Sequence, residues 1–167
     1  ALKQALAADG TPLLLLDYPH YFDRPGNPYL GPEGRDWLDN HLRFGLLSRV
    51  AALLSAPGSP LDWLPQALHC NDWQTALAPA FLHFLHAGPC AGTLMTIHNL
   101  AFQGVFGREA LSILGLPERA FGFDGVEFHT ASFGITGTES CPRAEFVANL
   151  DVLLTGKGSQ VDARLTP

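Results

Sequence analysis

Short apolar runs alternate with segments of helical periodicity along this chain. Three runs are short and continuously apolar, which is typical of strands: residues 11–17 (TPLLLLD), 66–70 (QALHC) and 93–98 (TLMTIH). Three segments repeat their apolar positions at helical spacing: residues 39–58, 75–88 and 107–116. The order strand, loop, helix, strand, helix, strand, helix predicts right-handed βαβ units. We therefore expect an α/β fold with a parallel sheet, in which residues 11–17 are buried on both faces.

The first helical segment shows the clearest apolar stripe: Leu42, Leu46, Val50, Leu53 and Leu54. Asp39 or Asn40 is placed to cap its start. Gly45 lies inside the segment, where glycine costs about 1 kcal/mol against alanine. Its presence there suggests close packing.

Two further segments carry specific expectations. Residues 18–34 are rich in Pro, Gly, Asn and Asp and predict a long loop, and its aromatic and histidine rings favour a functional one. Thr75 is placed to cap the second helical segment. The chain opens without Met, in what reads as a helix or a helix end, which suggests a piece of a longer protein.

Composition narrows the class of protein. Hydrophobic residues make up 47% and charged residues 16% of the 167 residues, which is typical of a globular domain rather than a disordered chain. The net charge of −6 and the lack of a basic block argue against nucleic acid as a partner. The apolar runs are too short to span a bilayer. The three cysteines form no CxxC pair, so we expect a reducing, cytoplasm-like compartment.

Polar side chains follow each of the three predicted strands. They are Asp17 after the first, His69, Asn71 and Asp72 at the second, and His98 and Asn99 at the third. Ligands of open parallel sheets bind beyond the carboxyl ends of the strands, so these groups are expected at one rim. Aromatic residues lie nearby in the sequence: Tyr29, Trp73 and Phe102. Hydroxyl-binding side chains with stacking rings suit a carbohydrate, and Arg24 is the one cation of these loops.

Several of these residues also have plainer explanations. Asp72 serves either this site or the cap of the helix that follows it. His69 is expected to be a packed neighbour of the site, and Gly104 to be required by a left-handed turn. Cys70 is read as a small buried side chain rather than a nucleophile. His83 and His86 lie three residues apart on a helix but lack a third ligand, so no metal site is expected.

Four segments together resemble one family. Residues 68–82 (LHCNDWQTALAPAFL) and 96–106 (TIHNLAFQGVF) are similar to signature segments of bacterial glycogen synthases and plant starch synthases. Residues 21–51 and 115–129 resemble the stretches before and after them, in family order. The resemblance implies a Rossmann-like parallel sheet, within a partial N-terminal, acceptor-side domain of a GT-B glycosyltransferase over residues 1–129. It also implies retaining transfer of glucose from ADP-glucose to the non-reducing end of an α-1,4-glucan, without a metal or another cofactor.

The resemblance assigns roles residue by residue. Asp72 and His98 match catalytic groups of the family, a carboxylate at the reaction centre and a histidine that contacts the transferred glucose. The residues that match substrate-binding or loop-shaping positions are Tyr29, Asn99, Gln103 and Gly104. The expected partners are ADP-glucose and an α-1,4-glucan, and the expected location is the bacterial cytoplasm, or a plastid in a plant.

The resemblance stops near residue 129. Residues 130–167 lose periodicity, as expected either from a reading-frame shift or chimeric join, which we favour, or from an authentic divergent tail. The donor-site segments of the family would lie outside the chain, so the chain alone is expected to be inactive. The alternatives are a non-catalytic glucan-binding remnant, a truncated pseudogene product, or another GT-B enzyme of sucrose synthase or trehalose-forming type.

Overall fold

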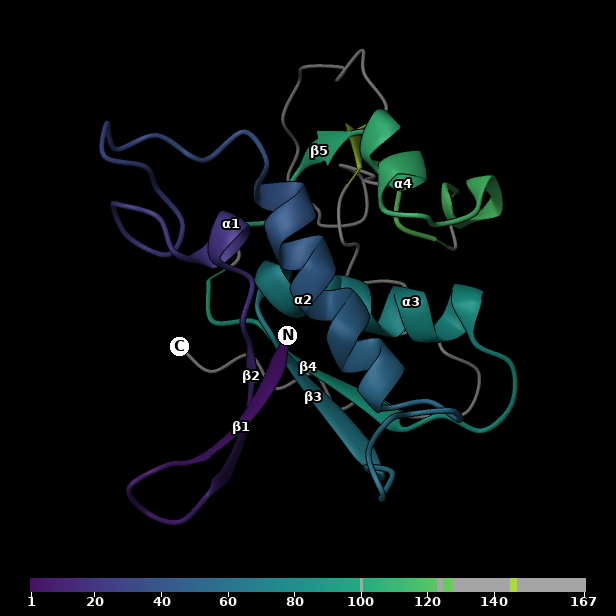
Figure 1. The fold of residues 1–167 in the computed structure, drawn as a ribbon. Helices are drawn as coiled ribbons and strands as arrows, with labels where there is room; N and C mark the ends of the chain where they lie inside the picture. Colours follow the sequence, from purple (N-terminus) through teal and green to yellow (C-terminus); the bar gives the residue numbers. More distant parts are fainter. Residues whose placement is uncertain (100, 123–124, 128–144, 147–167) are drawn as a thin grey trace.

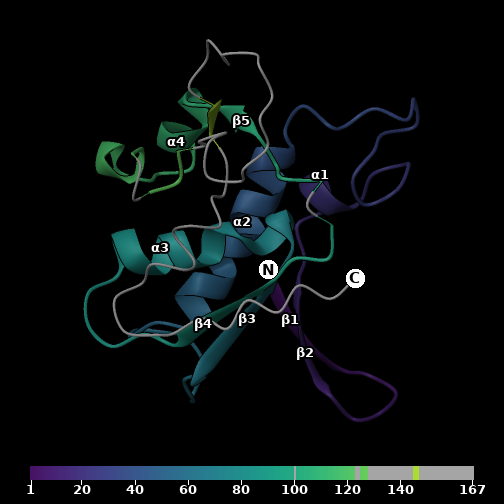
Figure 2. The same ribbon diagram turned by 180° about the vertical axis from the view of Figure 1, so that it is seen from behind.

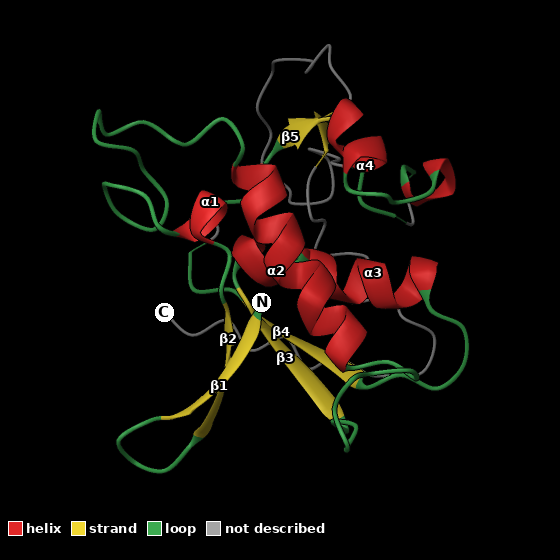
Figure 3. Cartoon of the chain, in the orientation of Figure 1, coloured by secondary structure: helices red, strands yellow, loops and turns green. Residues whose placement is uncertain are grey.

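A computed structural model of the chain describes residues 1–99, 101–122, 125–127 and 145–146. Its helices gather on one side of the first four strands, and the fifth strand lies beside the last helix (Figures 1 and 3). The strands are β1 (Leu2–Leu6), β2 (Pro12–Leu16), β3 (Ala67–Asn71), β4 (Gly92–Thr96), β5 (Phe106–Gly107) and β6 (Glu145–Phe146). The α-helices are α1 (Pro19–Phe22), α2 (Asn40–Leu54), α3 (Leu77–Leu85) and α4 (Glu109–Ile113), with short 3-10 turns η1 (Trp73–Thr75) and η2 (Glu118–Ala120). The expectations for the tail fall on residues 130–167, of which only 145–146 are among the described residues.

Strands β3 and β4 form the parallel pair that the sequence predicted. Ala67 lies opposite Gly92 and Asn71 opposite Thr96, and helix α3 lies between the two strands in the sequence. This is a βαβ unit, so the expectation of an α/β fold with parallel strands is confirmed. Figure 2, from behind, shows β3 and β4 running side by side beneath the helices.

The predictions for the first 17 residues are wrong in part. Residues 1–10 are not helical, because β1 pairs antiparallel with β2 in a hairpin that projects from the helices (Figure 1). The turn is closed by Gly10 at φ +85° and by the Asp9 carboxylate, which accepts from the Thr11 N–H at 2.9 Å. Strand β2 is therefore half-exposed and not buried on both faces. An Asp-Gly pair between apolar runs is a hairpin signal, and it explains this pairing.

The hydrophobic core lies among α2, α3 and α4. Its fully buried side chains include Ala52, Phe81 and Leu111. Helix α2 turns its small residues inward, so that Ser48 and Ala52 are buried while Leu53 is 46% exposed. The expectation that a leucine stripe faces the core is therefore only partly right. Small side chains face the core as well, because they allow the helices to approach most closely.

Two details of the helices bear on the sequence expectations. A side chain at Gly45 would overlap a methyl group of Leu114, so the close packing expected there is confirmed. Among the described residues, no helix is both long and apolar enough to cross a membrane.

Candidate functional site

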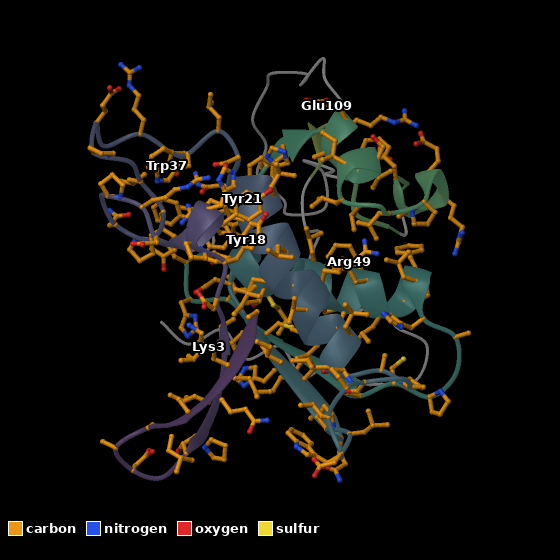
Figure 4. All side chains as sticks on the ribbon, viewed as in Figure 1. Lys3, Tyr18, Tyr21, Trp37, Arg49 and Glu109 are labelled. Atoms are coloured by element: carbon orange, nitrogen blue, oxygen red, sulfur yellow. The ribbon has the colours of Figure 1, made fainter. Side chains whose placement is uncertain are left out.

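The loop before α2 is fixed by an ion pair. Both guanidinium Nη atoms of Arg24 donate to the Asp39 carboxylate, at 2.8 and 2.7 Å, and Arg24 lies 4.9 Å from the Trp37 ring. Tyr21 and Trp37 lie together beside the N-terminal end of α2 (Figure 4). The hydrogen bond from Arg24 holds the pKa of Asp39 below its ordinary value. Asp39 therefore does not cap α2 with its side chain, and Arg24 is engaged by a carboxylate within the loop.

A second set of contacts places Tyr29. The buried Asn40 donates from Nδ2 to the Tyr29 carbonyl at 3.1 Å and accepts from Nη1 of Arg43 at 2.6 Å. Arg43 also donates from Nε to the Tyr21 carbonyl at 2.7 Å, and its burial lowers its pKa. The loop is thus attached to α2 at two points. Tyr29 remains 48% exposed, where a ligand can reach it.

Asp72 ends β3 in an unusual backbone conformation. Its φ is +55° and its ψ is 178°, and it is the single residue other than glycine with a positive φ in the described part of the chain. Its N–H still continues the ladder by donating to the Thr96 carbonyl at 2.8 Å. A non-glycine residue in this region is strained by about 1–3 kcal/mol and persists only where its surroundings hold it.

The strain places the Asp72 carboxylate against His98. The His98 N–H donates to Oδ1 at 2.7 Å, and ring Nδ1 lies 2.8 Å from Oδ2. In a regular parallel ladder the His98 N–H would meet the Asp72 carbonyl, because Asn71 is opposite Thr96. The carboxylate takes the place of that carbonyl. Asp72 makes no side-chain cap to the following helix, so the capping explanation is wrong.

A cleft of about 770 Å³ opens beside Asp72, within the usual size of ligand sites. The expected residues that line it are Tyr29, Asp72, Trp73, Asn99, Phe102, Gln103 and Gly104. His98 joins them through its contacts with Asp72. The lining residues that the sequence did not suggest for the site are Leu30, Asp36, Asn40, Gln74, Ala101, Val105 and Phe106. The sequence suggests Asn40 only as a helix cap, and the others lie within the family-like segments without a residue type that marks them as ligand-binding.

Gly104 is required for two reasons. Its φ is +62°, as a left-handed turn demands, and a side chain there would overlap the indole ring of Trp73. That ring is fixed in turn by Phe44, edge-on at 4.9 Å, and by Phe106 at 5.7 Å. The loop after β4 therefore rests directly on the aromatic floor of the cleft.

Three polar residues singled out in the sequence lie elsewhere or play other parts. Asp17 pairs with Lys3 at 2.5 Å in the hairpin and does not join this rim, because β2 is not paired with β3 or β4. His69 is exposed rather than packed, and its Nε2 lies 2.7 Å from Oγ1 of Thr96. Cys70 is buried as expected, and burial raises the pKa of its thiol to about 11, so it is unreactive near neutral pH.

The charges of the cleft suit a neutral, hydroxylated ligand. Its described lining contains the carboxylates of Asp36 and Asp72, several amides and four aromatic rings, but no Lys or Arg. Among the described residues, no group of three or more His, Cys, Asp or Glu is placed to hold a metal ion. Amides and carboxylates hydrogen-bond sugar hydroxyls, and aromatic faces pack on the apolar faces of sugar rings.

Ligands of open α/β sheets bind beyond the carboxyl ends of the strands, and this cleft lies where β3 and β4 end. Residues 2–147 match the family described as starch synthase catalytic domain. The chain belongs to this family of GT-B glycosyltransferases, as part of its N-terminal domain, which confirms the resemblance read from the sequence.

Curated relatives of the chain are named glycogen synthases. The chain is 65% identical to a glycogen synthase of Dechloromonas aromatica over 117 residues, 70% of this chain and 24% of the relative. It is 53% identical to one from Nitrosospira multiformis over 123 residues, 74% of this chain and 25% of the relative. The chain therefore spans about a quarter of the length of these relatives.

Proposed function

We propose that this chain forms the acceptor side of the active site of a glycogen-synthesising glucosyltransferase. The reaction transfers glucose from ADP-glucose to the non-reducing end of an α-1,4-glucan, with retention of the anomeric configuration. The observation that carries the proposal is the Asp72–His98 pair at the wall of a cleft whose described lining is aromatic and hydroxyl-binding. Membership of the starch synthase catalytic domain family supports the same reaction class.

In this proposal Asp72 is an electrostatic catalyst. The bond between the anomeric carbon and the ADP oxygen breaks while a bond to a glucan hydroxyl forms, and the hydroxyl proton leaves with ADP. Positive charge grows at the sugar ring during this step, and a fixed carboxylate stabilises it. Both oxygens of Asp72 already accept contacts from His98, which favours a charge-stabilising role over attack on the sugar.

His98 and the surrounding loops bind the sugar. With Nδ1 held by Asp72, the other ring nitrogen of His98, on an exposed side chain, is left to meet a glucose hydroxyl. Asn99 and Gln103 provide amides in the same loop, and Tyr29 provides a half-exposed ring on the opposite loop. Gly104 shapes the loop by resting on the cleft floor.

Glucan binding by the 167-residue chain tests the acceptor half of the proposal. We expect maltoheptaose to perturb tryptophan fluorescence, because Trp73 lines the cleft. His98→Ala should weaken this binding by up to about tenfold, the size expected for the loss of one hydrogen bond. The matched control is His83→Ala, since His83 is an exposed histidine of α3 outside the cleft lining. Equal loss in both variants, or no binding by the parent chain, would contradict the proposed acceptor site.

Transferase activity tests the other half. We expect no incorporation of glucose from ADP-glucose into glycogen by this chain alone, because the described cleft lining offers no cation for a pyrophosphate. Incorporation above background would show that the chain holds a complete donor site.

A further inference from the structure

The hydroxyl of Thr75 closes the turn that carries Asp72. Oγ1 of Thr75 accepts from the Asn71 N–H at 2.6 Å and donates to the Asn71 carbonyl at 2.8 Å. One side chain thus satisfies both backbone groups of the last residue of β3. This contact replaces the helix-capping role that the sequence suggested for Thr75, since Ala76 stands at the N-terminal boundary of α3.

These backbone groups have no partner in β4. The Asp72 N–H donates to Thr96 of β4, and successive residues of a strand direct their N–H and C=O groups to opposite sides. The groups of Asn71 therefore face away from β4. Among the described strands, β3 pairs with β4 alone, so on this side the hydroxyl of Thr75 stands where a further strand would.

The turn beyond depends on the same residue. The Thr75 N–H donates to the Asp72 carbonyl at 3.2 Å, which draws that carbonyl away from β4. With the Asp72 carbonyl turned away, the carboxylate occupies the ladder position in front of the His98 N–H. A strained φ persists only when the surrounding contacts hold it in place. Thr75 supplies such contacts on both sides of the peptide bond between Asn71 and Asp72, through its hydroxyl to Asn71 and through its N–H to the Asp72 carbonyl.

We propose that Thr75 is a positioning residue of the acceptor site, and that its hydroxyl holds Asp72 in the conformation that meets His98. The importance of this for glucan binding rests on the proposed function, whereas the geometric effect does not.

The test uses the full chain with three substitutions, Thr75→Val, Thr75→Ala and Thr75→Ser. Valine keeps the shape without the hydroxyl, alanine is a second removal if valine disturbs folding, and serine restores the hydroxyl. A ¹H–¹⁵N correlation spectrum reads the His98 amide directly, because a bond to a carboxylate shifts its proton downfield and slows its exchange. Thermal unfolding by circular dichroism checks that each variant is folded, and maltoheptaose titration gives the functional readout.

We expect Thr75→Val and Thr75→Ala to move the His98 amide upfield, to speed its exchange about tenfold and to weaken maltoheptaose binding several-fold. Thr75→Ser should restore all three. An unchanged His98 amide in the folded variants, or serine behaving like valine, would overturn the inference. The inference would also be overturned if the Thr75 variants displaced the His98 amide without changing glucan affinity, while His98→Ala lowered that affinity. If His98→Ala has no effect on glucan binding, the proposed function fails, and the amide signal alone still decides whether Thr75 positions Asp72.

Discussion

The strain at Asp72 predicts an inverted order of stability between two substitutions. Asp72→Ala and Asp72→Gly both remove the carboxylate and its two contacts with His98, so that loss cancels in the comparison. Alanine keeps a side chain at φ +55°, whereas glycine has no steric penalty there. The native Asp72 already has a Cβ, so alanine introduces no new clash.

The magnitude follows from two opposing effects. Relief of the strained backbone should favour glycine by about 1–3 kcal/mol. The greater freedom of glycine in the unfolded chain should favour alanine by about 0.5–1 kcal/mol. We therefore expect Asp72→Gly to be more stable than Asp72→Ala by about 1 kcal/mol, although glycine is the less stable choice at an ordinary position.

Urea unfolding followed by circular dichroism measures this difference, provided that the two variants share the same slope. The matched control is the same pair at Asn71, the preceding strand residue, where glycine should be less stable than alanine. If Asp72→Gly were as stable as Asp72→Ala or less stable, the left-handed backbone would not be strained, and the reasoning about Thr75 would lose its energetic basis.

Three further perturbations have definite expected outcomes. Gly104→Ala should destabilise the chain by about 2 kcal/mol in urea unfolding, from ring overlap and a left-handed φ, whereas Gly92→Ala, with ordinary contacts, should change it far less. The lowered pKa of Asp39 stabilises the folded chain above the ordinary value of 3.8, and this stabilisation is lost as pH falls through the folded-state pKa. Asp39→Asn should therefore lose less stability than the parent chain below about pH 4, as measured by acid unfolding. Its pairing with Arg24 predicts that Arg24→Gln has the same effect, and opposite trends would contradict the pairing. In a chain with Cys90→Ala and Cys141→Ala, Cys70, with its thiol pKa raised to about 11, should react with a disulfide reagent at pH 8 only on unfolding. Rapid reaction of that folded chain would contradict the burial of Cys70.

Periodicity was sufficient to predict the central elements. The apolar runs before Asn71 and His98 became β3 and β4, and the helical repeats became α2, α3 and α4. Because parallel strands end at one rim, the sequence also brought Asp72 and His98 together correctly. Periodicity does not state which strand pairs with which, however, and residues 11–17 were placed in the wrong sheet. Their Asp-Gly turn was local information that favoured the hairpin over a buried central strand.

The finer geometry of the site lay beyond any pattern in the sequence. The left-handed φ of Asp72 falls on a residue followed by Trp73, with no glycine to mark a turn. With its ψ at 178°, Asp72 lies outside the left-handed helical region that aspartate tolerates, in a region adopted almost only by glycine, so its residue type does not predict the conformation. The contact between Gly104 and Trp73 joins residues far apart in the chain, and only packing reveals it.

The end of the sheet and the candidate catalytic pair are one structure. The Asp72 carboxylate stands where the Asp72 carbonyl would continue the ladder, so the last contact between the ends of β3 and β4 is also the contact that orients His98. Removing the carboxylate therefore leaves the His98 N–H without its acceptor and frees the start of the loop after β4. A loss of glucan binding in an Asp72 variant would combine lost charge with lost loop position. The Thr75→Val variant separates the two, because it retains the charge of Asp72 and removes a support for its position.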